Sequence, residues 1–173
     1  MRMAALPERL GLNVPLVVWR VDREEFAATW DSGIGAERVG GRWNPIGVRA
    51  VYASLDPATA ILEVAVHKGF KVLDTQPHVM TGIEIASTDS VIIVEPEAVP
   101  NPAWLQSGLP GAGQQAFGAA LLAAYDALLI PSAVSRHSWN LVFSPERGRG
   151  KFRKVEQRRL AIDTRLNPPV AAP

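Results

Sequence analysis

The chain has 173 residues, of which 47% are hydrophobic and 20% are charged. This length and composition suit one globular domain with a sizeable core and exclude disorder over most of the chain. Because 18 Lys and Arg face 17 Asp and Glu, the net charge of +1 provides no overall field that favours nucleic acid or an anionic membrane. The lack of cysteine excludes a disulfide framework, a Cys-based zinc site and a thiol nucleophile. The sequence has neither a signal-peptide pattern nor a long apolar run, so we expect a cytoplasmic protein without membrane contact.

Seven short strands are predicted, of which the first is rich in β-branched residues and is closed by Asp22. They cover residues 15–21, 48–54, 78–86, 90–94, 127–134, 138–143 and 154–162. In the first strand, Arg20 shares a face with Leu16 and Val18, which places a guanidinium on an otherwise apolar face. In the fifth strand, Pro131 indicates either an edge position or a bend.

Helices are predicted over residues 23–30, 58–67 and 114–125. Asp56 and Pro57 supply an N-cap and a first-turn proline for the second helix, and Gly69 ends it. This helix carries Glu63 among Ala, Ile, Leu and Val, so we expect it to be buried on most sides. The Pro-rich segment 95–113 predicts a long loop, which would be either a lid or a surface excursion. Strands outnumber helices without alternating regularly with them, which favours an α+β fold over a doubly wound one.

Several catalytic patterns are absent or lack the right context. Residues 111–116 match the dinucleotide-binding pattern G-x-G-x-x-A, but no predicted strand precedes them, which argues against a Rossmann site. No G-x-S-x-G elbow occurs. The three histidines, His67, His78 and His137, show no metal-ligand spacing, so we expect surface or structural roles for them and no metal site.

Polar side chains that suit one reaction occur close together in the first half of the chain. Cleavage of an N-glycosidic bond passes through an oxocarbenium-like transition state, which a carboxylate such as Glu63 stabilises while it binds a ribose hydroxyl. A guanidinium binds a pyrophosphate through two parallel hydrogen bonds, which suits Arg42 and Arg20. The ring of Tyr52 would stack on a nicotinamide, and Trp43 would form a wall of the site.

Two other interpretations remain open at this point. In the first, Arg20 or Arg42 forms a structural ion pair with Glu63 that holds a loop on the sheet. In the second, the chain is a non-catalytic module that binds a phosphorylated ligand or nucleic acid through the same pocket or through residues 147–159. That basic segment holds seven Lys and Arg against one Glu, although a charged edge strand that resists aggregation explains it equally well.

Five segments of the sequence resemble, in the same order, the RES-domain family, the toxins of bacterial toxin–antitoxin pairs. They are GRWNPIG at 41–47, AVYAS at 50–54, AILEV at 60–64, IPSAV at 130–134 and WNLVFSP at 139–145. The family name records an arginine, a glutamate and a serine, which correspond here to Arg42, Glu63 and Ser132. The resemblance implies a catalytic domain over 14–166 with an ADP-ribosyltransferase-like fold, in which flanking helices pack on a mixed or antiparallel sheet. Residues 1–13 would be an N-terminal extension and residues 167–173 a flexible tail.

The resemblance also implies an enzyme that cleaves the nicotinamide N-glycosidic bond of NAD+ and transfers the ADP-ribosyl group to protein, phosphate or water. NAD+ would be a consumed substrate, and no tightly bound cofactor is expected. The partner would be a cognate antitoxin of the Xre type that covers the cleft, so that the protein meets nucleic acid only through it. The residues implied as catalytic are Arg42, Tyr52, Glu63 and Ser132. The residues implied to bind NAD+ are Arg20, Arg42, Trp43, Tyr52 and Asn140.

Overall fold

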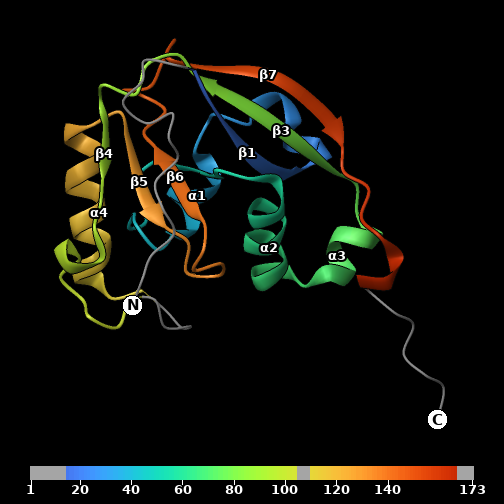
Figure 1. The fold of residues 1–173 in the computed structure, drawn as a ribbon, viewed down its shortest axis with the longest axis horizontal. Helices are drawn as coiled ribbons and strands as arrows, with labels where there is room; N and C mark the ends of the chain where they lie inside the picture. The colour runs from blue at the N-terminus through green and yellow to red at the C-terminus, as the bar shows by residue number, and fades with distance from the viewer. Residues whose placement is uncertain (1–14, 105–109, 167–173) are drawn as a thin grey trace.

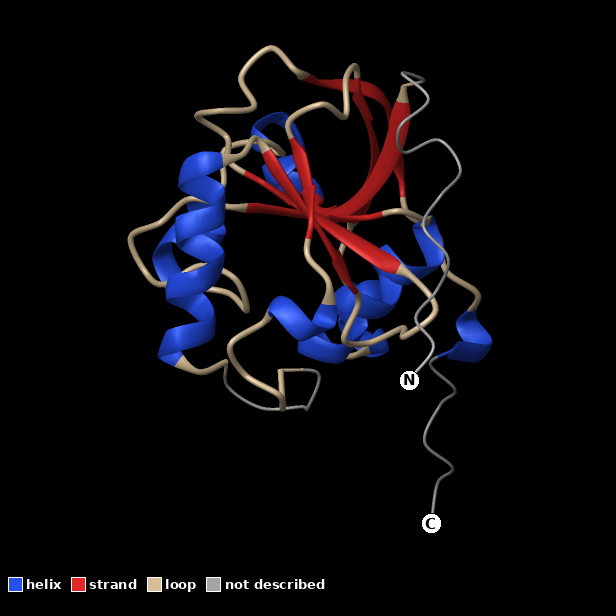
Figure 2. Ribbon diagram, turned by 60° about the vertical axis from the view of Figure 1, so that its left-hand side comes forward, coloured by secondary structure: helices blue, strands red, loops and turns tan. Residues whose placement is uncertain are grey.

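The computed structural model describes residues 15–104 and 110–166. The predicted N-terminal extension, residues 1–13, and the predicted C-terminal tail, residues 167–173, lie outside the described residues. Within the described ranges, seven strands form one twisted sheet, and helices lie beside and below it (Figures 1 and 2). This arrangement confirms the predicted α+β fold with a single sheet.

The sheet has the strand order β4-β5-β6-β2-β1-β3-β7. The strands are β1 Leu16–Arg23, β2 Val51–Ser54, β3 His78–Ile85, β4 Val91–Ile93, β5 Ala127–Pro131, β6 Trp139–Phe143 and β7 Phe152–Arg159. Neighbouring strands are antiparallel, except that β4 and β5 are parallel. Each predicted strand is therefore present in the structure. Pro131 ends β5, but β5 lies between β4 and β6, so the edge position suggested by this proline is wrong and the bend is correct.

The helices differ more from the sequence prediction than the strands do. They are α1 Ile34–Val39, α2 Pro57–Lys68, α3 Phe70–Thr75 and α4 Ala112–Ala124, with 3-10 helices η1 Glu24–Thr29, η2 Pro96–Ala98 and η3 Thr164–Leu166. The sequence does not predict α1 and α3, because six residues are too few to show a helical period. In the part of the chain that the structure describes, no helix combines the length and apolarity that crossing a bilayer requires.

The start of α2 follows its sequence signals closely. The carboxylate of Asp56 accepts a hydrogen bond from the Thr59 N–H at 2.8 Å, and Pro57 occupies the first turn. The expected burial of this helix is wrong, however, because Leu62 is 37% exposed and Val66 is 64% exposed. The helix packs against β1, β2 and α3, and Leu62 and Val66 lie on the side of the helix that faces away from these elements.

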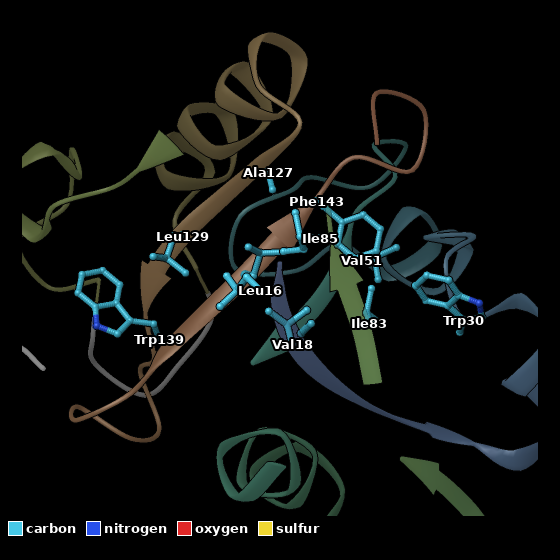
Figure 3. Close-up of a cluster of buried hydrophobic side chains, with 12 residues drawn as sticks. Leu16, Val18, Trp30, Val51, Ile83, Ile85, Ala127, Leu129, Trp139 and Phe143 are labelled. Carbon is cyan, nitrogen blue, oxygen red and sulfur yellow. The ribbon is translucent and has the colours of Figure 1, made fainter. Parts of the chain in front are cut away.

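Two apolar clusters cover opposite faces of the interior strands. Leu129 of β5 and Leu141 of β6 belong to the first cluster, which Figure 3 shows together with Trp30, and each is 0% exposed. Their neighbours Leu128 and Val142 belong to the second cluster, where α4 contributes Leu122. Because adjacent residues of a strand point to opposite faces, these strands are buried on both sides. They therefore form a rigid base for the side chains at their ends.

Candidate functional site

A pocket of about 650 Å³ opens between α2, the ends of β1, β2, β5 and β6, and the loop after α1. This volume lies within the range of about 300–1,000 Å³ that is usual for small-molecule sites. The pocket brings together residues that are far apart in the sequence. Six of the seven predicted site residues line it, namely Arg20, Arg42, Trp43, Tyr52, Glu63 and Asn140. The seventh, Ser132, is 0% exposed and reaches the pocket through its contact with Glu63.

The carboxylate of Glu63 is held by side chains from two other parts of the chain. Ser132 Oγ donates a hydrogen bond to Glu63 Oε1 at 2.8 Å, and Asn140 Nδ2 donates to the same oxygen. Within the described ranges, Oε2 has no hydrogen-bond partner from the protein. The carboxylate is therefore fixed through one oxygen, which leaves the other free to accept a hydrogen bond from a ligand.

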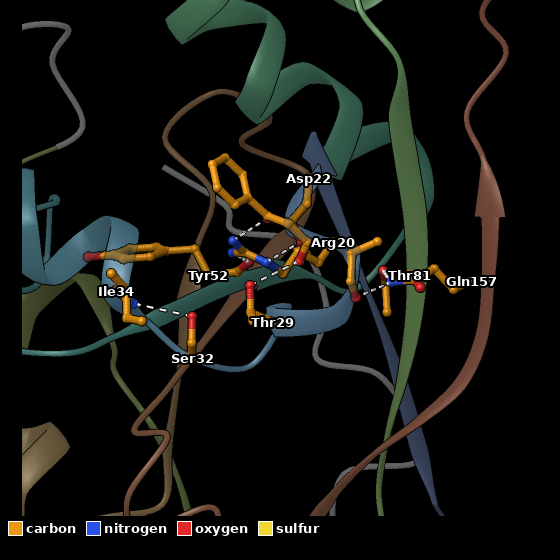
Figure 4. A network of polar contacts seen from close by, with 10 residues as sticks. Arg20, Asp22, Thr29, Ser32, Ile34, Tyr52, Thr81 and Gln157 are labelled. Carbon is orange, nitrogen blue, oxygen red and sulfur yellow. Dashed lines mark hydrogen bonds and ion pairs between the residues drawn. The ribbon is translucent and has the colours of Figure 1, made fainter. Parts of the chain in front are cut away.

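Arg20 is bound to the protein rather than to Glu63. Its Nε donates to Asp22 Oδ2 at 2.7 Å, its Nη2 contacts Asp22 Oδ1, and its Nη1 donates to the carbonyl of Tyr52 at 2.8 Å (Figure 4). Asp22 follows Arg20 by two residues on β1, so the period of two would have identified this partner. No ion pair joins Glu63 to Arg20 or Arg42 within the described residues, so the structural ion-pair interpretation is wrong.

The guanidinium of Arg42 can still bind an anionic ligand, because its hydrogen-bond partner in the protein is neutral. Its Nη1 donates to the carbonyl oxygen of Trp104 at 2.6 Å, and no carboxylate pairs with it among residues 15–104 and 110–166. The loop that carries it is fixed from α4, where Gln115 Nε2 donates to the carbonyl of Gly41 at 2.8 Å. The structure thus places an unpaired guanidinium at the wall of the pocket, anchored through one nitrogen.

The hydroxyl of Tyr52 holds the same loop in place. It donates to Asn44 Oδ1 at 2.6 Å and accepts from the Trp43 N–H at 3.1 Å. Burial raises the pKa of Tyr52 well above its usual range, so the phenol stays neutral. A Cβ on Gly41 would lie 2.4 Å from this hydroxyl, which explains the glycine before Arg42. Both hydrogen-bonding roles of the hydroxyl are filled, so the ring is the part of Tyr52 that is left for a ligand.

The sequence interpretation misses several residues at this site, among them Asn44, His67 and Lys68. Asn44 is 0% exposed and its Nδ2 donates to the carbonyls of Ala36, at 2.9 Å, and Val48, at 2.8 Å, which organises the loop. Its place in the GRWNPIG segment is the only sequence signal for this role. His67 and Lys68 line the pocket at the C-terminal end of α2. The spacing of four between Glu63 and His67 places them on one helix face, which would have identified the histidine.

Metal binding and the basic segment 147–159 receive no support as functions. Among the described residues, no group of three or more His, Asp or Glu lies close enough together to hold a metal ion. The basic segment includes β7, which is an edge of the sheet. Its cations largely meet carboxylates, in the pairs Arg147–Asp126, Lys151–Asp126, Arg153–Glu84 and Arg158–Glu156. This pairing favours a charged edge strand over a phosphate-binding patch.

Comparisons with known proteins agree with the ordered sequence motifs. The chain is 31% identical over 153 residues to "Toxin Res" of Pseudomonas putida, which covers 87% of this chain and 99% of that protein. It is 30% identical over 155 residues to the "Prs ADP-ribosylating toxin" of Sphingobium sp., with coverages of 86% and 94%.

A solved structure, the crystal structure of the M. tuberculosis MbcT–MbcA toxin–antitoxin complex, has the same fold. The TM-score is 0.69 at 23% identity, and the match covers 90% of this chain and 94% of that one. The family model described as "RES domain" matches residues 17–165. The chain therefore belongs to the RES domain family.

Proposed function

We propose that this chain is the NAD+-consuming toxin of a toxin–antitoxin pair and acts in the cytoplasm. It cleaves the nicotinamide N-glycosidic bond of NAD+ and transfers the ADP-ribosyl group to an acceptor. The observation that carries the proposal is the carboxylate of Glu63, which Ser132 and Asn140 hold through Oε1 in a pocket of about 650 Å³. The relatives named "Toxin Res" and "Prs ADP-ribosylating toxin" support it.

In this mechanism, Glu63 Oε2 accepts a hydrogen bond from a ribose hydroxyl. The bond between the anomeric carbon and the nicotinamide nitrogen breaks, and its electron pair neutralises the pyridinium as nicotinamide leaves. The nearby carboxylate stabilises the positive charge that develops on the ribose. The unpaired guanidinium of Arg42 binds the pyrophosphate, and the ring of Tyr52 packs against the nicotinamide. A lone pair of the acceptor then forms the new bond at the anomeric carbon, and the proton that the acceptor carried passes to water.

Release of free nicotinamide from NAD+ by the purified chain tests this proposal. We expect Glu63→Gln to lower the rate by about a hundredfold or more, since it removes the charge that meets the transition state. Glu97→Gln makes the same change on an exposed residue of η2 outside the pocket, so it should keep the wild-type rate. Far-UV circular dichroism and thermal unfolding check that both variants are folded. Equal rates for wild type and folded Glu63→Gln would refute the catalytic role of Glu63.

The same reaction identifies the acceptor. Transfer to a protein is supported by the name of the Sphingobium relative, which describes an ADP-ribosylating toxin. Mass spectrometry of the products, with and without added phosphate and with cell extract as the source of protein acceptors, separates the three outcomes. Labelled protein identifies transfer to protein, a phosphorylated ADP-ribose identifies phosphorolysis, and free ADP-ribose identifies hydrolysis.

We further propose that an antitoxin of the Xre type covers the mouth of the pocket. The structural neighbour is a toxin–antitoxin complex, and apolar side chains stand exposed beside the pocket of this chain. Val39 lines the pocket and is 78% exposed, while Val66 on α2 is 64% exposed. Exposed apolar residues next to a cleft are typical of an interaction surface. Titrating the chain with its antitoxin should abolish nicotinamide release at equal molar amounts, and full activity in the complex would refute this arrangement.

A further inference from the structure

We propose that Ser54 is a positioning residue of the candidate catalytic site, which acts on Glu63 through Asn140. The inference rests on the proposed function of Glu63. Ser54 belongs to none of the predicted site residues, although it lines the pocket as the last residue of β2. Its side chain is almost completely buried, at 2% exposure, so its hydroxyl needs a partner within the protein.

The register of the sheet brings Ser54 and Asn140 together. They are directly opposite each other in the antiparallel pair of β2 and β6. Residues in this relation point to the same face, with their Cβ atoms about 4.5–5.5 Å apart. On its other side, Ser54 is opposite Trp19 of β1. Ser54 therefore sits between two paired strands, and its place relative to Asn140 is set by the backbone of the sheet.

The hydrogen bond between these two side chains sets the direction of the Asn140 amide. Ser54 Oγ donates to Asn140 Oδ1 at 2.8 Å, so the amide oxygen faces Ser54. The amide nitrogen then faces Glu63 and donates to its Oε1. The reversed amide would set its oxygen against the carboxylate, where neither atom has a proton to donate. The serine hydroxyl thus selects the orientation in which Asn140 holds Glu63.

Loss of the Ser54 hydroxyl removes the donor to the amide oxygen of Asn140, a half-buried residue at the pocket wall. The amide is then free to tilt away from Glu63, which leaves Ser132 as the remaining side chain that fixes Oε1. A carboxylate that moves by a fraction of an ångström still permits NAD+ to bind through Arg42 and Tyr52, but it meets the ribose less well in the transition state. We therefore expect the change to appear in kcat and to leave KM nearly unaltered.

Kinetics of nicotinamide release test this inference. We expect Ser54→Ala to lower kcat by about five- to tenfold, the effect of one neutral hydrogen bond, with KM within about twofold. Ser144→Ala is the matched control, because it removes the hydroxyl of another buried serine, 8% exposed, that does not line the pocket. It should keep the wild-type kcat. Thermal unfolding of each variant separates a kinetic effect from loss of fold.

A double-mutant cycle distinguishes action through Asn140 from a general structural role. In an Asn140→Ala background, Ser54→Ala should lower kcat no further, because the side chain through which it acts is gone. The inference is overturned if Ser54→Ala lowers kcat in the Asn140→Ala background as much as it does in the wild type, or if Ser54→Ala alone has the wild-type kcat. In either case, nicotinamide release by the wild type still upholds the proposed function. A wild-type chain that releases no nicotinamide overturns both.

Discussion

The contact between α4 and the loop at Trp43 leads to a sharp prediction about stability. Gly118 is buried in the middle of α4, and a Cβ at this position would lie 2.2 Å from the carbonyl oxygen of Trp43. Cβ atoms essentially never approach another heavy atom closer than 3.0 Å. The atom in the way belongs to the backbone and has no rotamer to escape into, so Gly118→Ala forces the helix and the loop apart.

Two effects of opposite sign determine the size of the change. Alanine is better than glycine in a helix interior by about 1 kcal/mol. Overpacking a well-packed core costs about 1–3 kcal/mol, and a backbone contact this short belongs at the upper end. The free energy of unfolding should therefore fall by about 1–2 kcal/mol, which for a chain of this length lowers the Tm by roughly 2–8 °C.

Urea unfolding of two glycine variants in the same helix provides the assay. In Gly113→Ala no atom of the described residues outside the helix's own backbone and the adjoining residues lies within 4 Å of the new Cβ, so this variant should be as stable as the wild type or slightly more stable. The new Cβ of Gly118→Ala would displace Trp43, which is next to Arg42 in the chain, so this variant should also slow nicotinamide release. A Gly118→Ala variant that gains as much stability as Gly113→Ala would refute the reasoning, since helix propensity would then outweigh the contact.

Two further predictions concern the pH dependence of stability. Burial disfavours the charge on Asp56, but hydrogen bonds from Ser138 and Thr59 outweigh this effect and lower the pKa of Asp56. The stability that the Asp56 carboxylate contributes to the fold is therefore complete above its ordinary pKa of 3.8 and is lost as the pH falls below that value. Asp56→Ala, which removes the N-cap of α2, should lower the free energy of unfolding by about 1 kcal/mol near neutral pH, and urea titrations should show this difference shrinking in acid; a constant difference would contradict the assignment. Burial raises the pKa of Tyr52 above its ordinary value of 10.0, so the unfolded chain ionises first and stability falls as pH rises above that value. Tyr52→Phe should show a smaller alkaline decline in thermal melts, and an identical decline would contradict the burial of this phenol.

Local signals in the sequence predict the strands and helices of this fold better than they predict how these elements are arranged in space. The strand β1, for example, is rich in valine, and α2 follows from the cap at Asp56 and the glycine at 69, which has a φ of 80°. The strand order has no such signal, because it depends on which strands meet in space. The sequence interpretation therefore gives the α+β class, while the interior position of β5 and the register of Ser54 against Asn140 appear only in the structure.

At the candidate site, too, the sequence predicts which residues take part but not which residues contact one another. The motifs of the RES-domain family identify Arg42 and Glu63, and both line the pocket. From charge alone, Glu63 is a possible ion-pair partner of Arg20. In the structure, Arg20 pairs instead with Asp22, two residues further along the same strand. Arg20 pairs with the carboxylate that its own strand places beside it, and the distance between Glu63 and β1 cannot be read from the sequence. In the part of the chain that the structure describes, Glu63 has no cationic partner and is held by the neutral donors Ser132 and Asn140.

The hydroxyl of Ser132 makes structural contacts and also takes part in the proposed site. Its oxygen accepts hydrogen bonds from the Val134 N–H at 3.2 Å and the Ser135 N–H at 2.9 Å, which closes the bend after Pro131. These two bonds fill the acceptor sites of the oxygen, so its proton is directed to the remaining neighbour, Glu63 Oε1. The bend therefore orients the donor that fixes the carboxylate. A threonine would keep these bonds but add a methyl group at a position that is 0% exposed, so serine is the residue that satisfies both the bend and the site.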